Sequence, residues 1–234
     1  MFFKSLWDDF LNLLFPNCCL QCNEVIADRK RYLCDECKTK IQYTDYHFYP
    51  NNNELFYELY NQTHLDMAFA MCSFVNHGPV QALMHHLKYK GCTDIGVRLG
   101  EIYGQMLPES LAKKFDVIVP IPLHSIRLKQ RGYNQSDFIA CGMNKYLHAT
   151  IDTTSVIRCK NTKSQTTKGK YNRILDMKDA FQVVNPSALK NKRILVVDDI
   201  ITTGATITSC AKTIKNSCHC NVSVCAIAKT MSEF

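Results

Sequence analysis

Residues 193–206 (R-I-L-V-V-D-D-I-I-T-T-G-A-T) constrain the fold of this 234-residue chain more than any other stretch. Four apolar residues predict a short buried strand that ends in two adjacent carboxylates, Asp198 and Asp199. The residues that follow supply hydroxyls, a flexible glycine and a helix start, namely Thr202, Thr203, Gly204, Ala205 and Thr206. A buried strand followed by a capped helix would explain the threonines and the glycine, but it leaves the double Asp unexplained.

This combination predicts a particular kind of ligand. A loop at a helix start presents backbone N–H groups to an anion, and phosphate is the obvious candidate. The two carboxylates can accept hydrogen bonds from vicinal sugar hydroxyls or hold Mg²⁺ through oxygen. The stretch therefore predicts a site for a phosphorylated, metal-bound ribose.

The N-terminal part of the chain contains two cysteine pairs, Cys19-x2-Cys22 and Cys34-x2-Cys37. Four thiolates at this spacing can occupy the corners of a tetrahedron, the geometry of a structural Zn²⁺ site, and such a site has no open position for chemistry. Redox disulfides are the competing interpretation, and Cys18 is an alternative ligand. We expect a zinc-stapled module over residues 1–42, because so short a module cannot bury enough core to hold itself together.

The composition narrows the class of protein. A formal net charge of +7 suits a partner that is a polyanion or a phosphorylated small molecule, without separating the two. Thirteen cysteines, an odd number in a long chain, fit a reducing compartment better than a secreted disulfide scaffold. The apolar run of residues 1–15 is interrupted by Asp8 and Asp9, which argues against a signal peptide or a membrane span. A helix docked on its own chain is favoured over a membrane-surface anchor, because the polar face of an anchor should be richer in Lys and Arg.

The remainder divides into a connector, residues 43–65 with a short helix near 55–60, and a second domain, residues 66–234. In this second domain, strands alternate with helices, which predicts a mostly parallel α/β sheet with ligands at the carboxyl ends of its strands. The expected strands are 67–75, 116–120, 155–159, 180–184, the signature strand and 222–228, and the expected helices are 79–87, 96–106, 136–146 and about 203–215. A polar loop is expected after the strand at 116–120.

Two polar segments carry candidate binding residues. The loop contains a guanidinium-rich run with a phenol and two amides, which can hydrogen-bond to and stack on a base or a nucleic-acid strand: Arg127, Arg131, Tyr133, Asn134 and Gln135. The insert 160–178 is strongly basic and is either a flap that closes over an anionic ligand or a solvated loop; its candidate contacts are Lys163, Lys168, Lys170 and Arg173.

The signature V-V-D-D-I-I-T-T-G-A-T resembles that of type I phosphoribosyltransferases. This resemblance implies that the acidic pair contacts the ribose and Mg²⁺ of phosphoribosyl pyrophosphate, and that the threonine loop wraps its 5′-phosphate. The motif K-Y-K-G resembles the pyrophosphate loop of the same enzymes and assigns that role to Lys88, Lys90 and Gly91, although two lysines beside a glycine are also an ordinary solvated helix end.

The run P-I-P-L-H-S-I-R-L-K-Q-R-G-Y-N-Q, together with the cysteine pairs, is similar to the ComF family of bacterial competence proteins. In that family a zinc-binding module precedes a phosphoribosyltransferase-like domain. One departure is Asp176, which stands where the family pattern has Asn and which puts the local contact of the flap in doubt.

The resemblance implies a role in natural transformation, in which the protein handles incoming single-stranded DNA at the cytoplasmic side of the inner membrane. A DNA-translocating helicase is the expected partner, and peripheral contact with the inner membrane is an associated expectation. The alternative is an active phosphoribosyltransferase that transfers phosphoribosyl to a nucleobase or another small acceptor. No sequence feature separates the two, because the substrate supplies the acceptor nucleophile.

Overall fold

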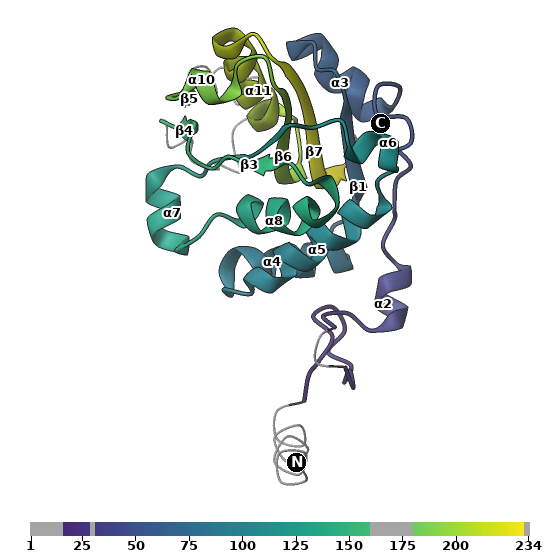
Figure 1. Cartoon of the computed structure of the whole chain (residues 1–234). Helices are drawn as coiled ribbons and strands as arrows, with labels where there is room; N and C mark the ends of the chain where they lie inside the picture. Colours follow the sequence, from purple (N-terminus) through teal and green to yellow (C-terminus); the bar gives the residue numbers. More distant parts are fainter. Residues whose placement is uncertain (1–15, 29–30, 160–179, 232–234) are drawn as a thin grey trace.

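The computed structural model describes residues 16–28, 31–159 and 180–231 of the chain. Its centre is a five-stranded sheet in which every neighbouring pair of strands is parallel (Figure 1). In spatial order the strands are β1 (Ala68–Phe74), β7 (Asn221–Thr230), β6 (Arg193–Ile201), β2 (Val117–Pro120) and β3 (Thr150–Ile151). The signature strand β6 is therefore central, and its carboxyl end lies between those of β7 and β2.

Helices cover both faces of the sheet (Figure 1). One face packs against α4 (Pro79–Tyr89), α5 (Thr93–Met106) and α8 (Gln135–Leu147), and the other against α3 (Glu54–Thr63) and α11 (Ala205–Cys218). Side chains along β6 alternate between these cores, with Leu195 in the first and Ile194 in the second, because successive strand residues point to opposite faces. The predicted mostly parallel α/β sheet with flanking helices is confirmed.

Shorter elements complete the fold. They are α2 (Asp35–Thr39), α6 (Glu109–Ala112), α7 (Ser125–Arg131), α10 (Pro186–Leu189) and the antiparallel pair β4 (Val156–Arg158) and β5 (Phe181–Val183). The segment after β2, predicted to be a loop, contains helix α7. The His124 ring nitrogen Nδ1 accepts from the N–H of Ile126 at the start of α7, and Gly132 ends the helix in the left-handed conformation at φ 81°.

The predicted end of strand β6 was also wrong. The carboxylates do not end the strand, because Ile200 and Ile201 continue its pairing with Ala228 and Lys229 of β7. The acidic pair is therefore held inside a hydrogen-bonded strand, which fixes its backbone more firmly than a loop would.

The cysteine module contacts the first core. Buried cysteines of the module belong to the same apolar cluster as α4 and α5, and Gln21 Nε2 donates to the carbonyl of His77 at 2.7 Å. Helix α3, in the stretch predicted as a connector, contributes Leu55 and Leu59 to the second core. The domain limits at residues 42 and 65 stay a prediction.

Two predicted features lie outside the described residues: the N-terminal helix, and the flap with Lys163, Lys168, Lys170 and Arg173. Within the part of the chain that is described, no helix combines the length and the apolar character needed to cross a membrane.

Candidate functional site

A cavity of about 680 Å³ opens at the carboxyl ends of β6 and β2. Such a volume is ordinary for a small-molecule site, and this end of a parallel sheet is where ligands of α/β proteins bind. The lining combines four cationic side chains with both carboxylates of the pair: Lys88, Tyr89, Gly91, Ile121, Leu123, Arg127, Gln130, Arg131, Tyr133, Gln135, Arg158, Asp198, Asp199, Ile200, Thr202 and Thr206.

The acidic pair is buried, with relative exposures of 8% for Asp198 and 4% for Asp199. Oδ1 of Asp198 accepts from the backbone N–H of Asp199 at 2.9 Å and from the Ser136 hydroxyl at 3.3 Å. Burial, with a further contribution from the Asp199 charge, raises the pKa of Asp198 to about 7. A cation placed between the two carboxylates would relieve this cost, which is the electrostatic environment expected of a metal-binding acid pair.

Lys88 already supplies one cation to this pair. Its Nζ lies 2.5 Å from Oδ2 of Asp199, while Oδ1 of Asp199 accepts from the N–H of Ile200 at 2.8 Å. Lys88, which is predicted to bind the pyrophosphate, and Asp199, which is predicted to bind the metal, therefore form an ion pair with each other. Gly91 also lines the cavity, whereas Lys90 is exposed and does not line it.

The threonine loop leads into α11 beside the acidic pair. Gly204 adopts φ 72°, and a Cβ there would lie 2.2 Å from Cδ2 of Leu59, so the position requires glycine. Gly204 has no side chain to cap α11, although Thr203 Oγ1 accepts a long hydrogen bond of 3.5 Å from the N–H of Ala205, and Thr202 and Thr206 line the cavity. Backbone N–H groups at the positive end of a 14-residue helix suit an anion, and the binding of a phosphate by this loop stays a prediction.

The run from Arg131 to Gln135 mainly shapes the cavity wall. The Tyr133 hydroxyl donates to the carbonyl of Leu87, and Gln135 accepts from the Arg131 guanidinium, which lies 5.5 Å from the centre of the Tyr89 ring. Arg127, Arg131, Tyr133 and Gln135 line the cavity, and their contact with a base or DNA stays a prediction.

Asn134 differs from its neighbours because it does not line the cavity. Its side-chain oxygen accepts from the N–H of Ser136, and its amide group donates to the carbonyl of Ile121 at 3.0 Å and to Asp137 at 2.7 Å. Through these contacts Asn134 caps the start of α8 and connects this helix to the end of β2.

Two residues that the sequence did not single out belong to the site. Ser136 has no sequence signal beyond its place at a helix start, yet it donates to Asp198. Arg158 lies on β4 and reaches the cavity, 5.3 Å from the centre of the Phe181 ring on β5. Only the pairing of β4 with β5 reveals its place, although the basic residues that follow it in the sequence were a weak hint.

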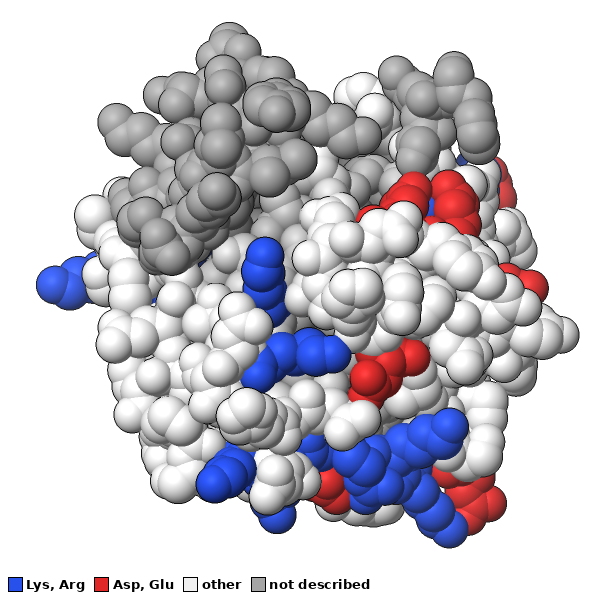
Figure 2. All heavy atoms as spheres, turned by 90° about the horizontal axis from the view of Figure 1, so that it is seen from above, with Lys and Arg blue, Asp and Glu red and all other residues white. Residues whose placement is uncertain are grey.

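On the face drawn in Figure 2, the described Lys and Arg side chains do not form one continuous patch. Figure 2 shows Lys and Arg side chains on two sides of a small acidic group on the face that it draws. The cationic side chains of the cavity are consequently the more specific electrostatic feature, because they converge on one enclosed volume.

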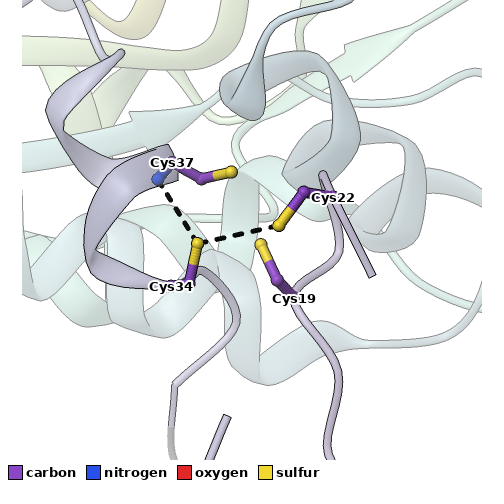
Figure 3. Close-up of side chains that lie close together, drawn as sticks. All are labelled: Cys19, Cys22, Cys34 and Cys37. Atoms are coloured by element: carbon purple, nitrogen blue, oxygen red, sulfur yellow. Dashed lines mark hydrogen bonds between the residues drawn. The ribbon is translucent and has the colours of Figure 1, made fainter. Parts of the chain in front are cut away.

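The four predicted cysteine ligands lie together (Figure 3). All four sulfur atoms are within 4.8 Å of one another, and the thiols of Cys22 and Cys34 are 3.7 Å apart, beyond the length of a disulfide. Burial opposes ionisation of Cys19, but backbone N–H groups of Cys22, Cys34 and Gln21 outweigh it and lower the pKa of the thiol to about 6. The cluster can hold a metal ion.

Cys18, the alternative ligand, is not part of this cluster. Its thiol lies 3.5 Å from the carbonyl of Pro16.

Comparison with known proteins gives three informative relatives and no matching family model. The chain is 27% identical over 164 residues to DNA utilization protein YhgH of Escherichia coli K12, covering 65% of this chain and 68% of the relative. It is 24% identical over 206 residues to competence protein F of Haemophilus influenzae, covering 84% and 90%. It is 31% identical over 124 residues to competence protein ComFC of Bacillus subtilis, covering 53% of this chain but only 48% of that protein.

Among solved structures, glutamine phosphoribosylpyrophosphate amidotransferase from B. subtilis overlaps with a TM-score of 0.40 at 16% identity. The overlap covers 61% of this chain and 30% of the amidotransferase. The fold described above rests on the strand order and helix packing of this chain and not on that overlap.

Proposed function

We propose, from the premise that this chain is a relative of the ComF competence proteins, that it binds phosphoribosyl pyrophosphate with Mg²⁺ and single-stranded DNA during DNA uptake. The observation that carries the ribose-phosphate part is the convergence of the acidic pair, the threonine loop and the end of α4 on one cavity. The cytoplasmic side of the inner membrane is the proposed place of action, with a DNA-translocating helicase as partner.

The residues divide the ligand among them. Asp198 and Asp199 receive the ribose hydroxyls and Mg²⁺, and the N–H groups at the start of α11 receive the 5′-phosphate. Mg²⁺, when bound, neutralises charge on the diphosphate and on the acidic pair. Lys88 exchanges its ion pair with Asp199 for the diphosphate, so one cation serves the carboxylate in the free protein and the ligand in the complex.

The cysteine cluster is proposed to hold a structural Zn²⁺. Four thiol ligands leave no open coordination position, and three of the four cysteines are buried in the module. The metal stabilises the module, which packs on α4 and α5 through the shared apolar core.

Single-stranded DNA is proposed to bind at the wall formed by α7, where guanidinium groups and Tyr133 line the cavity. Charge and stacking give binding that tolerates sequence and weakens as salt rises. The lysines of residues 160–178 are included as further contacts by the sequence alone.

Transfer of phosphoribosyl to a small acceptor is the second candidate, favoured by the room beside the acidic pair. An acceptor nitrogen would bond to the anomeric carbon as the bond from that carbon to the pyrophosphate oxygen breaks, with loss of the acceptor proton and departure of pyrophosphate. Nucleobases incubated with phosphoribosyl pyrophosphate and Mg²⁺ should then release pyrophosphate. If no nucleobase and no DNA caused pyrophosphate release, this result would count against phosphoribosyl transfer and would leave the binding proposal unaffected.

Isothermal titration of the full chain with phosphoribosyl pyrophosphate and Mg²⁺ tests the main proposal. The double variant Asp198→Ala, Asp199→Ala should bind at least about tenfold more weakly, because charge-assisted contacts of about 1.5–3 kcal/mol are lost. Asp94→Ala is the matched control, since this exposed carboxylate on α5 lies outside the cavity lining. Circular dichroism should show that both variants are folded, and equal affinity of the double variant and the control would refute the assignment.

A further inference from the structure

Tyr89, at the end of α4, is an aromatic side chain of the cavity that the proposed contacts do not use. It lines the cavity and is nevertheless 68% exposed, which places it at the rim. The residue before it, Lys88, has its Nζ 2.5 Å from Oδ2 of Asp199, so Tyr89 directly follows a residue of the predicted ribose-phosphate site. An exposed aromatic ring forgoes the free energy of burial, and a planar ligand that covers it would recover this free energy.

Two neighbours hold the Tyr89 ring in place. The guanidinium carbon of Arg131 lies over the ring, 5.5 Å from its centre, and the centre of the His85 ring lies 5.3 Å away, with the two rings tilted by 50°. The guanidinium of Arg131 also donates to the side-chain oxygen of Gln135. Tyr89 and Arg131 therefore form a pair that is fixed before a ligand arrives, which lowers the entropy cost of stacking a further planar group on it.

Among the described residues that line the cavity, Tyr133 is the only other aromatic one, and its contacts are made within the protein. Its hydroxyl donates to the carbonyl of Leu87, and its ring meets that of Phe138 edge-on, with centres 5.8 Å apart and an angle of 85°. Tyr133 is also part-buried, in contrast to Tyr89. The sequence motif singles out Tyr133, whereas the structure leaves the ring of Tyr89 more open to a ligand.

We infer that the Tyr89–Arg131 pair is a stacking site for a nucleobase at the rim of the cavity, next to the proposed site for phosphoribosyl pyrophosphate. This inference rests on the proposed function and names a contact for its second ligand, namely a base ring in addition to the phosphate backbone. A base suits the pair because every base has a π face that stacks on aromatic rings and on guanidinium groups, whatever the sequence. The base belongs either to a DNA strand or to a small acceptor.

The test compares two affinities of the full chain with those of Tyr89→Ala. Fluorescence anisotropy, with phosphoribosyl pyrophosphate and Mg²⁺ saturating, gives the affinity for labelled tetrathymidylate. Isothermal titration gives the affinity for phosphoribosyl pyrophosphate with Mg²⁺. We expect Tyr89→Ala to bind the tetranucleotide at least about fivefold more weakly, and to change the affinity for phosphoribosyl pyrophosphate less than about threefold.

Two further variants show whether the ring itself is responsible. Tyr89→Phe keeps the ring and loses only the hydroxyl, so it should bind the tetranucleotide within about twofold of the wild type. Tyr57→Ala is the matched control that should change neither affinity, because this exposed tyrosine of α3 lies outside the cavity lining. Circular dichroism should show that all three variants are folded.

Probe chemistry separates stacking from contact with the backbone. An abasic tetranucleotide keeps the phosphates but lacks the bases, so it should bind the wild-type protein more weakly than tetrathymidylate, and Tyr89→Ala should not weaken it further. The loss caused by Tyr89→Ala should also be the same at about 50 and about 200 mM salt, because a base stack releases no counterions. Competition by free thymine or thymidine would assign the site to a small acceptor base, and its absence would assign the site to a strand; either supports the inference.

Three results would overturn the inference and leave the proposed function standing. They are an unchanged affinity of Tyr89→Ala for tetrathymidylate, an equal loss of the abasic strand in that variant, or a loss in Tyr89→Phe as large as that in Tyr89→Ala. Failure of the wild-type protein to bind phosphoribosyl pyrophosphate would instead refute the ribose-phosphate part of the proposed function. Failure to bind tetrathymidylate would refute its DNA part together with the inference.

Discussion

Replacing Gly204 by alanine tests how the packing of α3 fixes the conformation of the threonine loop. The residue has φ 72°, a conformation that costs an L-amino acid about 1–2 kcal/mol. Its new Cβ would also lie 2.2 Å from Cδ2 of Leu59, a buried side chain of α3, and overpacking of this kind costs about 1–3 kcal/mol. We therefore expect Gly204→Ala to lower the free energy of unfolding by about 2–5 kcal/mol.

Gly91 provides a matched control. It has the same φ of 72°, but a Cβ there would meet no atom within 4 Å, so Gly91→Ala should cost only the backbone share of about 1–2 kcal/mol. Urea unfolding followed by circular dichroism measures both values. A third comparison, Gly204→Ala made in a Leu59→Ala background, should recover the smaller cost because the clash is gone. Equal losses at the two glycines, or no rescue by Leu59→Ala, would refute the packing argument.

Three further predictions follow from single contacts. Because the cysteine cluster is proposed to hold Zn²⁺, Cys37→Ser should purify without zinc, whereas Cys18→Ser should retain it. Equal zinc contents of the two purified variants by atomic absorption would contradict this ligand set. The Arg193 guanidinium lowers the pKa of Asp116 to about 2, so this pair stabilises the fold above about pH 4 and its contribution is lost as the pH falls toward 2. Asp116→Asn should flatten that part of a plot of melting temperature between pH 2 and 5, and an unchanged slope would contradict the linkage. Lys88→Met should strengthen Mg²⁺ binding to the free protein, because a competing cation is removed. The same variant should bind phosphoribosyl pyrophosphate about tenfold more weakly. Titration with each ligand measures the two affinities, and a change of both in the same direction would contradict the prediction.

Most of the helices and strands could be predicted from local patterns in the sequence. Apolar runs such as that of β1, and amphipathic helices such as α5, were predicted within a few residues of their ends because side-chain periodicity reflects the face that is buried. The grouping of Cys19 with Cys37 and the other two cysteines was equally predictable, because two short pairs can meet around one ion with little chain between them.

The errors have physical causes that a linear sequence hides. Helix α7 carries no buried residue, so it shows no apolar periodicity, and its ends are set by His124 and Gly132. Asn134 looked available to a base, but its hydrogen bonds at the start of α8 depend on the nearby end of β2. Arg158 reaches the cavity only because β4 and β5 pair across an insert of about twenty residues.

The ion pair between Lys88 and Asp199 changes how the signature motif is understood. Sequence motifs assign the lysine to the diphosphate and the carboxylate to the metal, as if each waited separately for its ligand. In the structure they neutralise each other in a part-buried place, with the lysine side chain 22% exposed and the carboxylate 6%. Separating such a pair costs free energy unless both partners gain a new one, since an unpaired buried charge is expensive. Metal without diphosphate, or diphosphate without metal, satisfies only one of them. Under the proposed function, the Lys88–Asp199 pair therefore favours binding of the complete magnesium complex of phosphoribosyl pyrophosphate over binding of either component alone.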